Sequence, residues 1–129
     1  MLFRSRIFIG ESDKHDGRPL YEALVSLFRE RGLAGATVVR AIAGFGSSSK
    51  VHTDSILRLS LDLPIIVEVV ETEEKLREVL PDLDRMIQGG LITLERAHVI
   101  MYRPGNVRPS QAEVHRIEGL EPADGSRDL

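Results

Sequence analysis

Residues 64–86 read PIIVEVVETEEKLREVLPDLDRM, a strand pattern followed directly by a helix pattern. The first part is apolar from Ile65 to Val70 except at Glu68, which is typical of a strand buried on both faces. Thr72 is suited to cap the helix, since its hydroxyl can accept a hydrogen bond from an N–H group of the first turn. The apolar residues of the helix recur at helical spacing: Leu76, Val79, Leu80, Leu83, Met86 and Ile87. We therefore predict a buried strand with an amphipathic helix packed on it.

Proline and glycine residues predict where the helix after this strand bends and ends. Pro81 lies inside the helical pattern, and we expect it to kink or divide the helix, because proline lacks a backbone donor and clashes with the preceding turn. Gly89 and Gly90 are predicted to end the helix. A final strand is predicted from Ile92 to Tyr102, either continuous or broken around residues 95–96.

The N-terminal part has the same order of strand and helix. Residues 2–10 alternate in a two-residue period that predicts a strand with one buried face, and residues 10–18 form a polar loop. Pro19 occupies a favourable first helical position, and Gly32 is predicted to end that helix.

Two further strands complete the pattern. The β-branched run within residues 35–42 predicts the second strand, and alternating leucines in residues 57–63 extend the third strand backwards, with Pro64 at a bend or an edge. The resulting order, βαββαβ, predicts a ferredoxin-like α+β fold: an antiparallel four-stranded sheet with two helices on one face. We assign residues 1–103 to this domain and residues 104–129, which are rich in proline, glycine and charge, to a flexible tail.

A sheet with helices on one face only leaves its other face in need of cover. The leucine alternation and the apolar run at residues 65–70 indicate strands that are wet on neither side. An oligomer that buries the second face is therefore expected rather than a monomer.

The composition limits the classes of function. The 129 residues have room for one domain, so a multidomain enzyme is excluded. The chain contains no cysteine, which removes disulfides, thiol nucleophiles and cysteine-based metal sites. A net charge of -3 provides no general basic field for nucleic acid, and no stretch approaches the length of a membrane helix. We expect a cytoplasmic protein without a nucleic-acid partner.

The strongest local signal is Gly44-Phe45-Gly46, at the end of a predicted strand and before the polar loop of residues 47–55. Paired glycines let backbone amides approach an anion, and the hydroxyl of Ser47 with the ammonium group of Lys50 could complete a phosphate cradle. The same glycines would also serve as a simple hinge for the loop.

Glu68 is the one acid in the apolar run, so it must be paired or face a cleft. Two interpretations stay open: a hydrogen bond to a hydroxyl group of a ligand, or an ion pair across the sheet, for instance with Arg40 or Arg58. A general base is a third role, although no catalytic constellation supports an enzyme. His52 and Asp54 could instead hold a divalent ion on the loop, which would make a metal-responsive or purely structural module.

Several motifs resemble the PII nitrogen-regulatory signalling proteins and, more closely, uncharacterised PII-like proteins. They are the string Ala-Gly-Phe-Gly ending at Gly46, the segment from Pro64 through Glu68 into an acidic helix start, and residues 90–95, Gly-Leu-Ile-Thr-Leu-Glu. The resemblance covers about residues 2–103. It implies a homotrimer whose sheets face inward and whose inter-subunit clefts bind an adenine nucleotide.

The resemblance also implies which residues bind the nucleotide. By position it assigns Gly44 and Gly46 to the base of the loop, Glu68 to an acid of the third strand, Gly90 to the turn after the second helix and Arg96 to a phosphate contact. The complete set of predicted nucleotide-binding residues is Gly44, Phe45, Gly46, Ser47, Lys50, Glu68, Gly89, Gly90 and Arg96.

The leading hypothesis is a non-enzymatic PII-like sensor that binds AMP or ADP and regulates a protein or membrane-transporter target through its mobile loop. Residues 91–96 contain no glycine, unlike the glycine-rich turn of PII proteins, and this favours a mono- or diphosphate over a triphosphate. Residues 47–55 contain no tyrosine, so the tyrosine modification of some PII proteins is not expected here.

Overall fold

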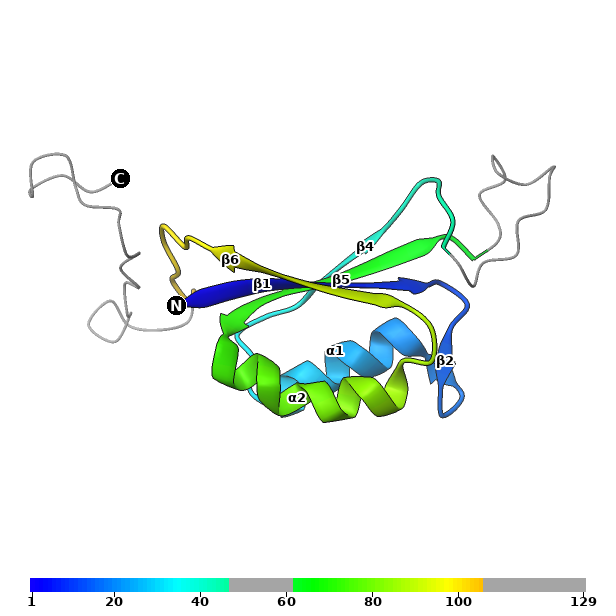
Figure 1. The fold of residues 1–129 in the computed structure, drawn as a ribbon, viewed down its shortest axis with the longest axis horizontal. Coiled ribbons are helices and arrows are strands. Elements are labelled where there is room, and N and C mark those ends of the chain that lie inside the picture. Colours follow the sequence, from blue (N-terminus) through cyan, green and yellow to red (C-terminus); the bar gives the residue numbers. More distant parts are fainter. Residues whose placement is uncertain (47–61, 106–129) are drawn as a thin grey trace, which may run out of the picture.

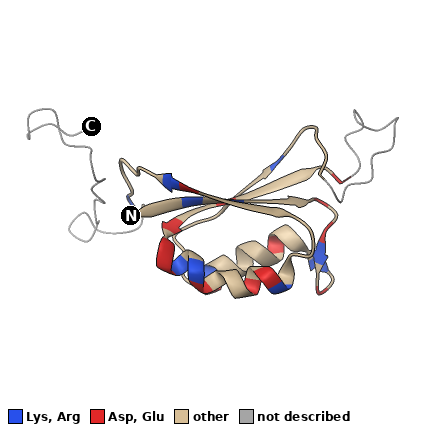
Figure 2. Ribbon diagram, viewed as in Figure 1, with Lys and Arg blue, Asp and Glu red and all other residues tan. Residues whose placement is uncertain are grey.

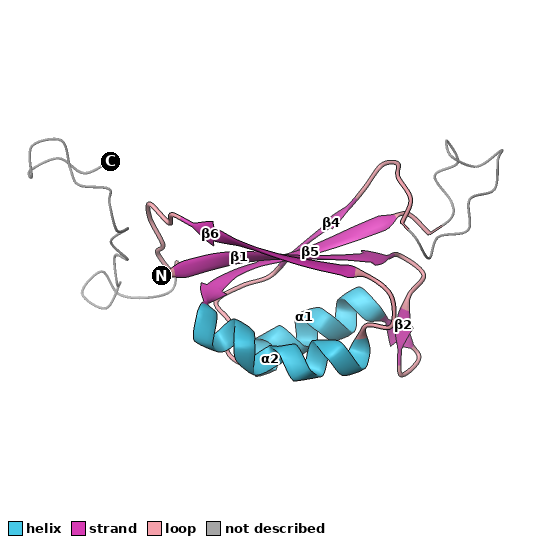
Figure 3. Cartoon of the chain, viewed as in Figure 1, coloured by secondary structure: helices cyan, strands magenta, loops and turns pink. Residues whose placement is uncertain are grey.

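The computed structural model describes residues 1–46 and 62–105 of the chain. Strands β4, β5, β1 and β6 form, in that order, one antiparallel sheet, and both helices cover the same face of it (Figure 1). Figure 3 shows these two layers, with α1 and α2 side by side beneath the sheet. The predicted ferredoxin-like α+β fold is confirmed. The elements are β1 (Leu2–Gly10), β2 (Lys14–His15), β3 (Arg18–Pro19), α1 (Leu20–Glu30), β4 (Thr37–Arg40), β5 (Pro64–Thr72), α2 (Glu73–Met86) and β6 (Leu91–Ala97).

The core lies between the two central strands and the helices. In β1 and β5 every second side chain is buried, and the register places Ile7 directly opposite Val67. Each fully buried aliphatic side chain contributes about 1.5–3 kcal/mol relative to exposure, so this layer supplies most of the stability. Its buried members are Ile7, Ile9, Leu20, Leu24, Phe28, Ile65, Val67, Val69, Leu76, Val79 and Leu83.

A short hairpin replaces part of the loop predicted at residues 10–18. β2 pairs with β3, and the turn between them uses positive φ values of 49° at Asp16 and 79° at Gly17. Pro19 belongs to this hairpin, opposite Lys14, so it precedes α1 instead of forming its first residue. The predicted start of the helix was therefore one residue early.

The two edge strands are shorter than predicted because their partners end. β6 stops at Ala97, which lies opposite Leu2 at the beginning of β1, instead of continuing to Tyr102. It runs without a break through residues 95–96. β4 stops at Arg40 rather than at residue 42, because the next partner position is Pro64, which has no N–H group to donate.

Pro81 does not divide the second helix. α2 is continuous from Glu73 to Met86, and the side chain of Thr72 accepts a hydrogen bond from the backbone N–H of Lys75 as predicted. Pro81 is exposed, whereas the buried side chains of Val79 and Leu83 hold both halves of the helix on the sheet. The strand predicted over residues 57–61 and most of the predicted tail, 104–129, lie outside the described residues.

Charged residues are frequent along both helices (Figure 2), and a buried one, Asp82, links the end of α1 to α2. Asp82 is buried and accepts hydrogen bonds from Arg31, just after α1, and from Arg85.

We expect Asp82→Ala to lower the free energy of unfolding by about 1–2 kcal/mol, because both guanidinium groups are partly exposed and stay solvated when the carboxylate is removed. Urea denaturation measures this loss.

The matched control for this change is Asp84→Ala, since Asp84 is an exposed acid on the same helix. It should change the free energy of unfolding by less than about 0.5 kcal/mol. Equal effects of the two substitutions would show that Asp82 does not join the helices.

Candidate functional site

A row of polar side chains crosses the sheet face that no helix of the described residues covers. The register places Thr93 of β6 opposite Arg6 of β1, Arg6 opposite Glu68 of β5, and Glu68 opposite Thr37 of β4. Burial alternates along β1 and β5, so these side chains point away from the helices. The middle of this face is therefore polar, which the apolar run in the sequence did not predict.

The neighbouring row, nearer the end of the sheet where β4 stops, is apolar. It contains Leu91, Phe8, Ile66 and Val39 in adjacent strands, and Leu91 and Val39 are 57% and 46% exposed. Exposed apolar rows of this kind favour contact with another surface. They agree with the expectation that this face needs cover, and the oligomer itself stays a prediction.

A cavity of about 660 Å³ lies at the β4 side of the polar row, and we call it the β4–β5 cavity. Its size is within the range of small-molecule sites, and it combines apolar walls with a few polar groups, as such sites do. The polar side chains are Thr37, Glu68, Glu71, Thr72 and Lys75, and Tyr102 adds a phenolic hydroxyl. The remaining lining residues are Leu2, Ala34, Gly35, Ala36, Val70 and Val99.

Glu68 is the predicted site residue that lines this cavity. Its Oε2 accepts a hydrogen bond from Nε of Arg6 at 3.4 Å, and both side chains are about one-third exposed. The predicted ion pair across the sheet is therefore confirmed, but its partner is Arg6 and not Arg40, which pairs with Glu11 with 2.6 Å between Nε and Oε2. The alternative partner, Arg58, lies outside the described residues.

Glu71 and Lys75 shape the wall of the cavity and were not predicted. Glu71 is buried, and its carboxylate accepts hydrogen bonds from the backbone N–H groups of Ala34 and Thr72. Lys75 donates to the carbonyl of Gly32 at 3.0 Å. These bonds tie the connection between α1 and β4 to the end of β5, so they hold Thr37 next to Glu68. An acid directly after the apolar run was the signal available in the sequence.

The predicted glycines lie at one end of the sheet, but at opposite edges. Gly44 follows β4 with a φ of 143°, and an added Cβ would lie 3.2 Å from Cγ of Pro64. Gly89 and Gly90 precede β6, and an added Cβ at Gly90 would lie 2.7 Å from the carbonyl oxygen of Phe8. The structure therefore does not bring the two glycine turns together within one chain.

The other residues predicted to bind the nucleotide do not lie together in the described part of the chain. Phe45 and Gly46 follow Gly44, and Phe45 is 71% exposed. Arg96 lies opposite Phe3, at the far end of β6 from Gly90. Ser47 and Lys50 lie outside the described residues. The same is true of His52 and Asp54, and residues 1–46 and 62–105 contain no group of three or more potential metal ligands.

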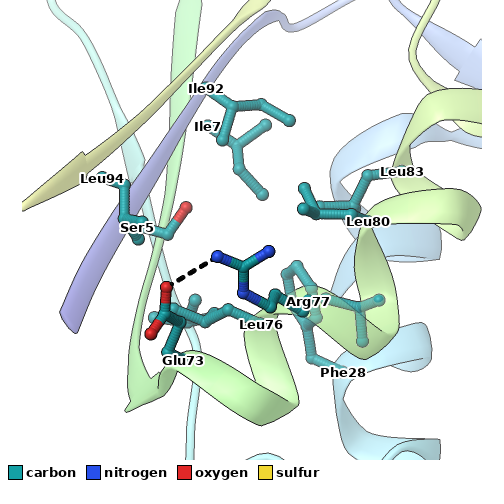
Figure 4. Close-up of a pocket in the computed structure, with 12 residues that line it drawn as sticks. Ser5, Ile7, Phe28, Glu73, Leu76, Arg77, Leu80, Leu83, Ile92 and Leu94 are labelled. Atoms are coloured by element: carbon teal, nitrogen blue, oxygen red, sulfur yellow. Dashed lines mark hydrogen bonds and ion pairs between the residues drawn. The ribbon is translucent and has the colours of Figure 1, made fainter. Parts of the chain in front are cut away.

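A second hollow, the α2–β6 groove, lies on the helix side of the sheet (Figure 4). It encloses about 180 Å³, and Leu80 of α2 and Leu94 of β6, which flank it, are 47% and 52% exposed. Its charged residues are Glu73 and Arg77, which pair with each other at 2.9 Å. Its lining is otherwise mainly aliphatic, so it suits side chains of a protein better than a polar small molecule.

Comparison with known structures identifies the class of fold. The structure of CPII from Thiomonas intermedia K12, bound to ADP and bicarbonate, is 19% identical and aligns with a TM-score of 0.51 over 73% of this chain and 83% of that one. A second CPII structure, of "a nitrogen regulatory PII-like protein" bound to ADP, AMP and bicarbonate, aligns with a TM-score of 0.47. The fold is that of a PII-like protein.

Sequence comparison then identifies the family. The chain belongs to the DUF190 family (Uncharacterized ACR, COG1993), which matches residues 3–99. A UPF0166 protein of Aquifex aeolicus (strain VF5) is 41% identical over 95 residues, covering 74% of this chain and 90% of the relative. UPF0166 protein MJ1524 of Methanocaldococcus jannaschii is 38% identical over 95 residues, covering 73% and 87%. The predicted membership of a family of uncharacterised proteins and the predicted PII-like fold are confirmed. In the described part of the chain, no helix is long and apolar enough to cross a membrane.

Proposed function

We propose that this chain is a subunit of a cytoplasmic, trimeric, non-enzymatic sensor that binds an adenine nucleotide, AMP or ADP, between neighbouring subunits. The observation that carries the proposal is the β4–β5 cavity, which places the carboxylate of Glu68 and the hydroxyl of Thr37 on an otherwise largely apolar wall. Apolar walls suit the flat faces of a purine, and a carboxylate accepts hydrogen bonds from the hydroxyl groups of a ribose.

The two edges of the sheet support a ring of subunits. β4 exposes Val38 and Val39, and β6 exposes Ile92 and Leu94, and within residues 1–46 and 62–105 neither strand has a neighbour on its outer side, so both edges combine apolar side chains with open backbone groups. The two edges differ, so a contact between them is head-to-tail, and such contacts close into a ring when the rotation allows it.

The same contact would bring glycine turns of two subunits together, at the end of the sheet opposite the β4–β5 cavity, with Glu68 midway along β5 between the two. The residues after β4 and those before β6 lie at one end of the sheet, as the register shows. In a ring whose axis runs along the strands, Gly44–Gly46 of one subunit would lie beside Gly89–Gly90 of the next. Backbone amides of two glycine turns form an anion site for phosphate groups. Ser47 and Lys50 remain proposed phosphate contacts beside these turns, whereas Arg96, at the far end of β6 from Gly90, remains a proposed contact on the resemblance alone.

The similar structure agrees with this ligand class, since CPII was solved with ADP. The segment that follows Gly46 is the proposed contact for a partner protein or transporter. Its conformation would be the signal, because a ligand shifts a conformational equilibrium when it binds one state better than another.

Isothermal titration calorimetry of the purified protein with AMP, ADP, ATP and cyclic AMP tests the proposal. We expect saturable heat from AMP or ADP at ligand concentrations of about 1 mM or below. Light scattering should give the mass of three chains, and the recovered nucleotide should be chemically unchanged. Absence of heat from all four nucleotides would overturn the proposal. Hydrolysed nucleotide would instead support an enzyme with Glu68 as general base.

A further inference from the structure

Arg6 makes a single contact with Glu68, and this contact leaves half of the carboxylate free. Nε of Arg6 donates to Oε2 of Glu68 at 3.4 Å, across a register that places the two residues directly opposite each other. In the described part of the chain, Oε1 of Glu68 accepts no hydrogen bond. A carboxylate oxygen can accept two, so Oε1 retains its full capacity for a ligand.

Among the described residues next to this pair, Arg6 is the cation that contacts Glu68, since the other neighbours are uncharged or paired elsewhere. Thr37 lies on the other side of Glu68, and Thr93 on the other side of Arg6. Arg4, one row away on the same strand, is engaged with Glu95 at 3.2 Å. Glu68 lines the β4–β5 cavity, whereas Arg6 does not, so Arg6 acts on the cavity through Glu68.

We propose that Arg6 is a positioning residue that sets the selectivity of the cavity for a ribose over a 2′-deoxyribose. By holding Oε2, it fixes the rotamer of Glu68 so that Oε1 is presented to the hydroxyl groups of the ligand. A carboxylate without this anchor samples other rotamers, and it then discriminates poorly between a ligand that carries the 2′-hydroxyl and one that lacks it. This inference rests on the proposed nucleotide function. It adds that the carboxylate of Glu68 recognises the hydroxyl groups of the sugar.

The experiment compares the dissociation constants of ADP and 2′-deoxy-ADP for the full-length protein and three variants. The wild type should bind ADP about tenfold more tightly than 2′-deoxy-ADP, because the deoxy ligand lacks the 2′-hydroxyl that would donate to Oε1 of Glu68. Arg6→Met should reduce this ratio to about twofold. Arg6→Lys, which retains a donor and a positive charge, should recover part of the ratio.

Arg4→Met is the matched control, because Arg4 forms an equivalent cross-strand pair that does not line the cavity. It should leave the ratio unchanged, and thermal melts of all variants show whether they are folded. An unchanged ratio in a folded Arg6→Met protein, or a wild type that does not discriminate between the two ligands, overturns the inference and leaves the proposed function intact. No binding of ADP or AMP by the wild type overturns both.

Discussion

Nucleotide affinity should fall about tenfold to a hundredfold when Glu68 is replaced by alanine. Hydrogen bonds to a charged group contribute about 1.5–3 kcal/mol, and removal of the carboxylate leaves the hydroxyl groups of a bound ribose without their acceptor in the β4–β5 cavity. Calorimetry with the nucleotide that binds the wild type most tightly measures the change.

Glu95→Ala provides the matched control for this substitution. Glu95 is also an acid on the uncovered face of the sheet and also pairs with an arginine, Arg4, but it does not line the cavity. Its replacement should change the affinity less than about twofold. In both variants the lost ion pair is partly exposed, so the free energy of unfolding should fall by less than about 1 kcal/mol. Equal affinities of the wild type and Glu68→Ala would place the nucleotide elsewhere.

The second large effect is expected at the turn before β6, where Gly90→Ala should lower the free energy of unfolding by about 1–3 kcal/mol. An added Cβ would lie 2.7 Å from the carbonyl oxygen of Phe8, and 3.1 Å and 3.3 Å from Cγ2 of Ile87 and Ile9. The nearest atom belongs to the backbone of a central strand, which cannot move without disturbing its pairing with β5 and β6. Urea denaturation measures the loss.

Gly35→Ala is the control for the methyl group itself. Among the described residues nothing lies within 4 Å of a Cβ added at Gly35, so its replacement should be neutral or stabilising by less than about 1 kcal/mol. If Gly90→Ala were as stable as Gly35→Ala, the turn would be able to move away from β1. The fold would then not require glycine at residue 90, and the role of Gly90 would be limited to its proposed contact with the ligand.

The periodicity of the chain was sufficient to predict the layers of the fold. Apolar spacing is a local property, and it identified β1, β5 and both helices because each must present an apolar side to the same core. The ends of the strands were harder to predict from the sequence. β6 stops at Ala97 because β1 offers no residue beyond Leu2, which is a fact about its partner rather than about its own sequence.

The candidate site was predicted only in part, because it too depends on how the strands are paired. Glu68 was identified from the sequence alone, because an acid inside an apolar strand requires a partner or a ligand. Its actual partner, Arg6, is 62 residues away and depends on the pairing of β1 with β5. Thr37 and Lys75 drew no attention in the sequence, since a threonine in a strand and a lysine in a helix are ordinary there.

The sequence by itself determined the order of strands and helices, the amphipathic faces and the one acid that has to be explained. The tertiary structure alone decided that this acid belongs to a polar row, that the row borders a cavity, and that the two glycine turns share one end of the sheet but opposite edges. The physical reason is the range of the interactions. Burial follows from the spacing of neighbouring residues, whereas contacts between strands depend on a register that the packing of the whole domain selects.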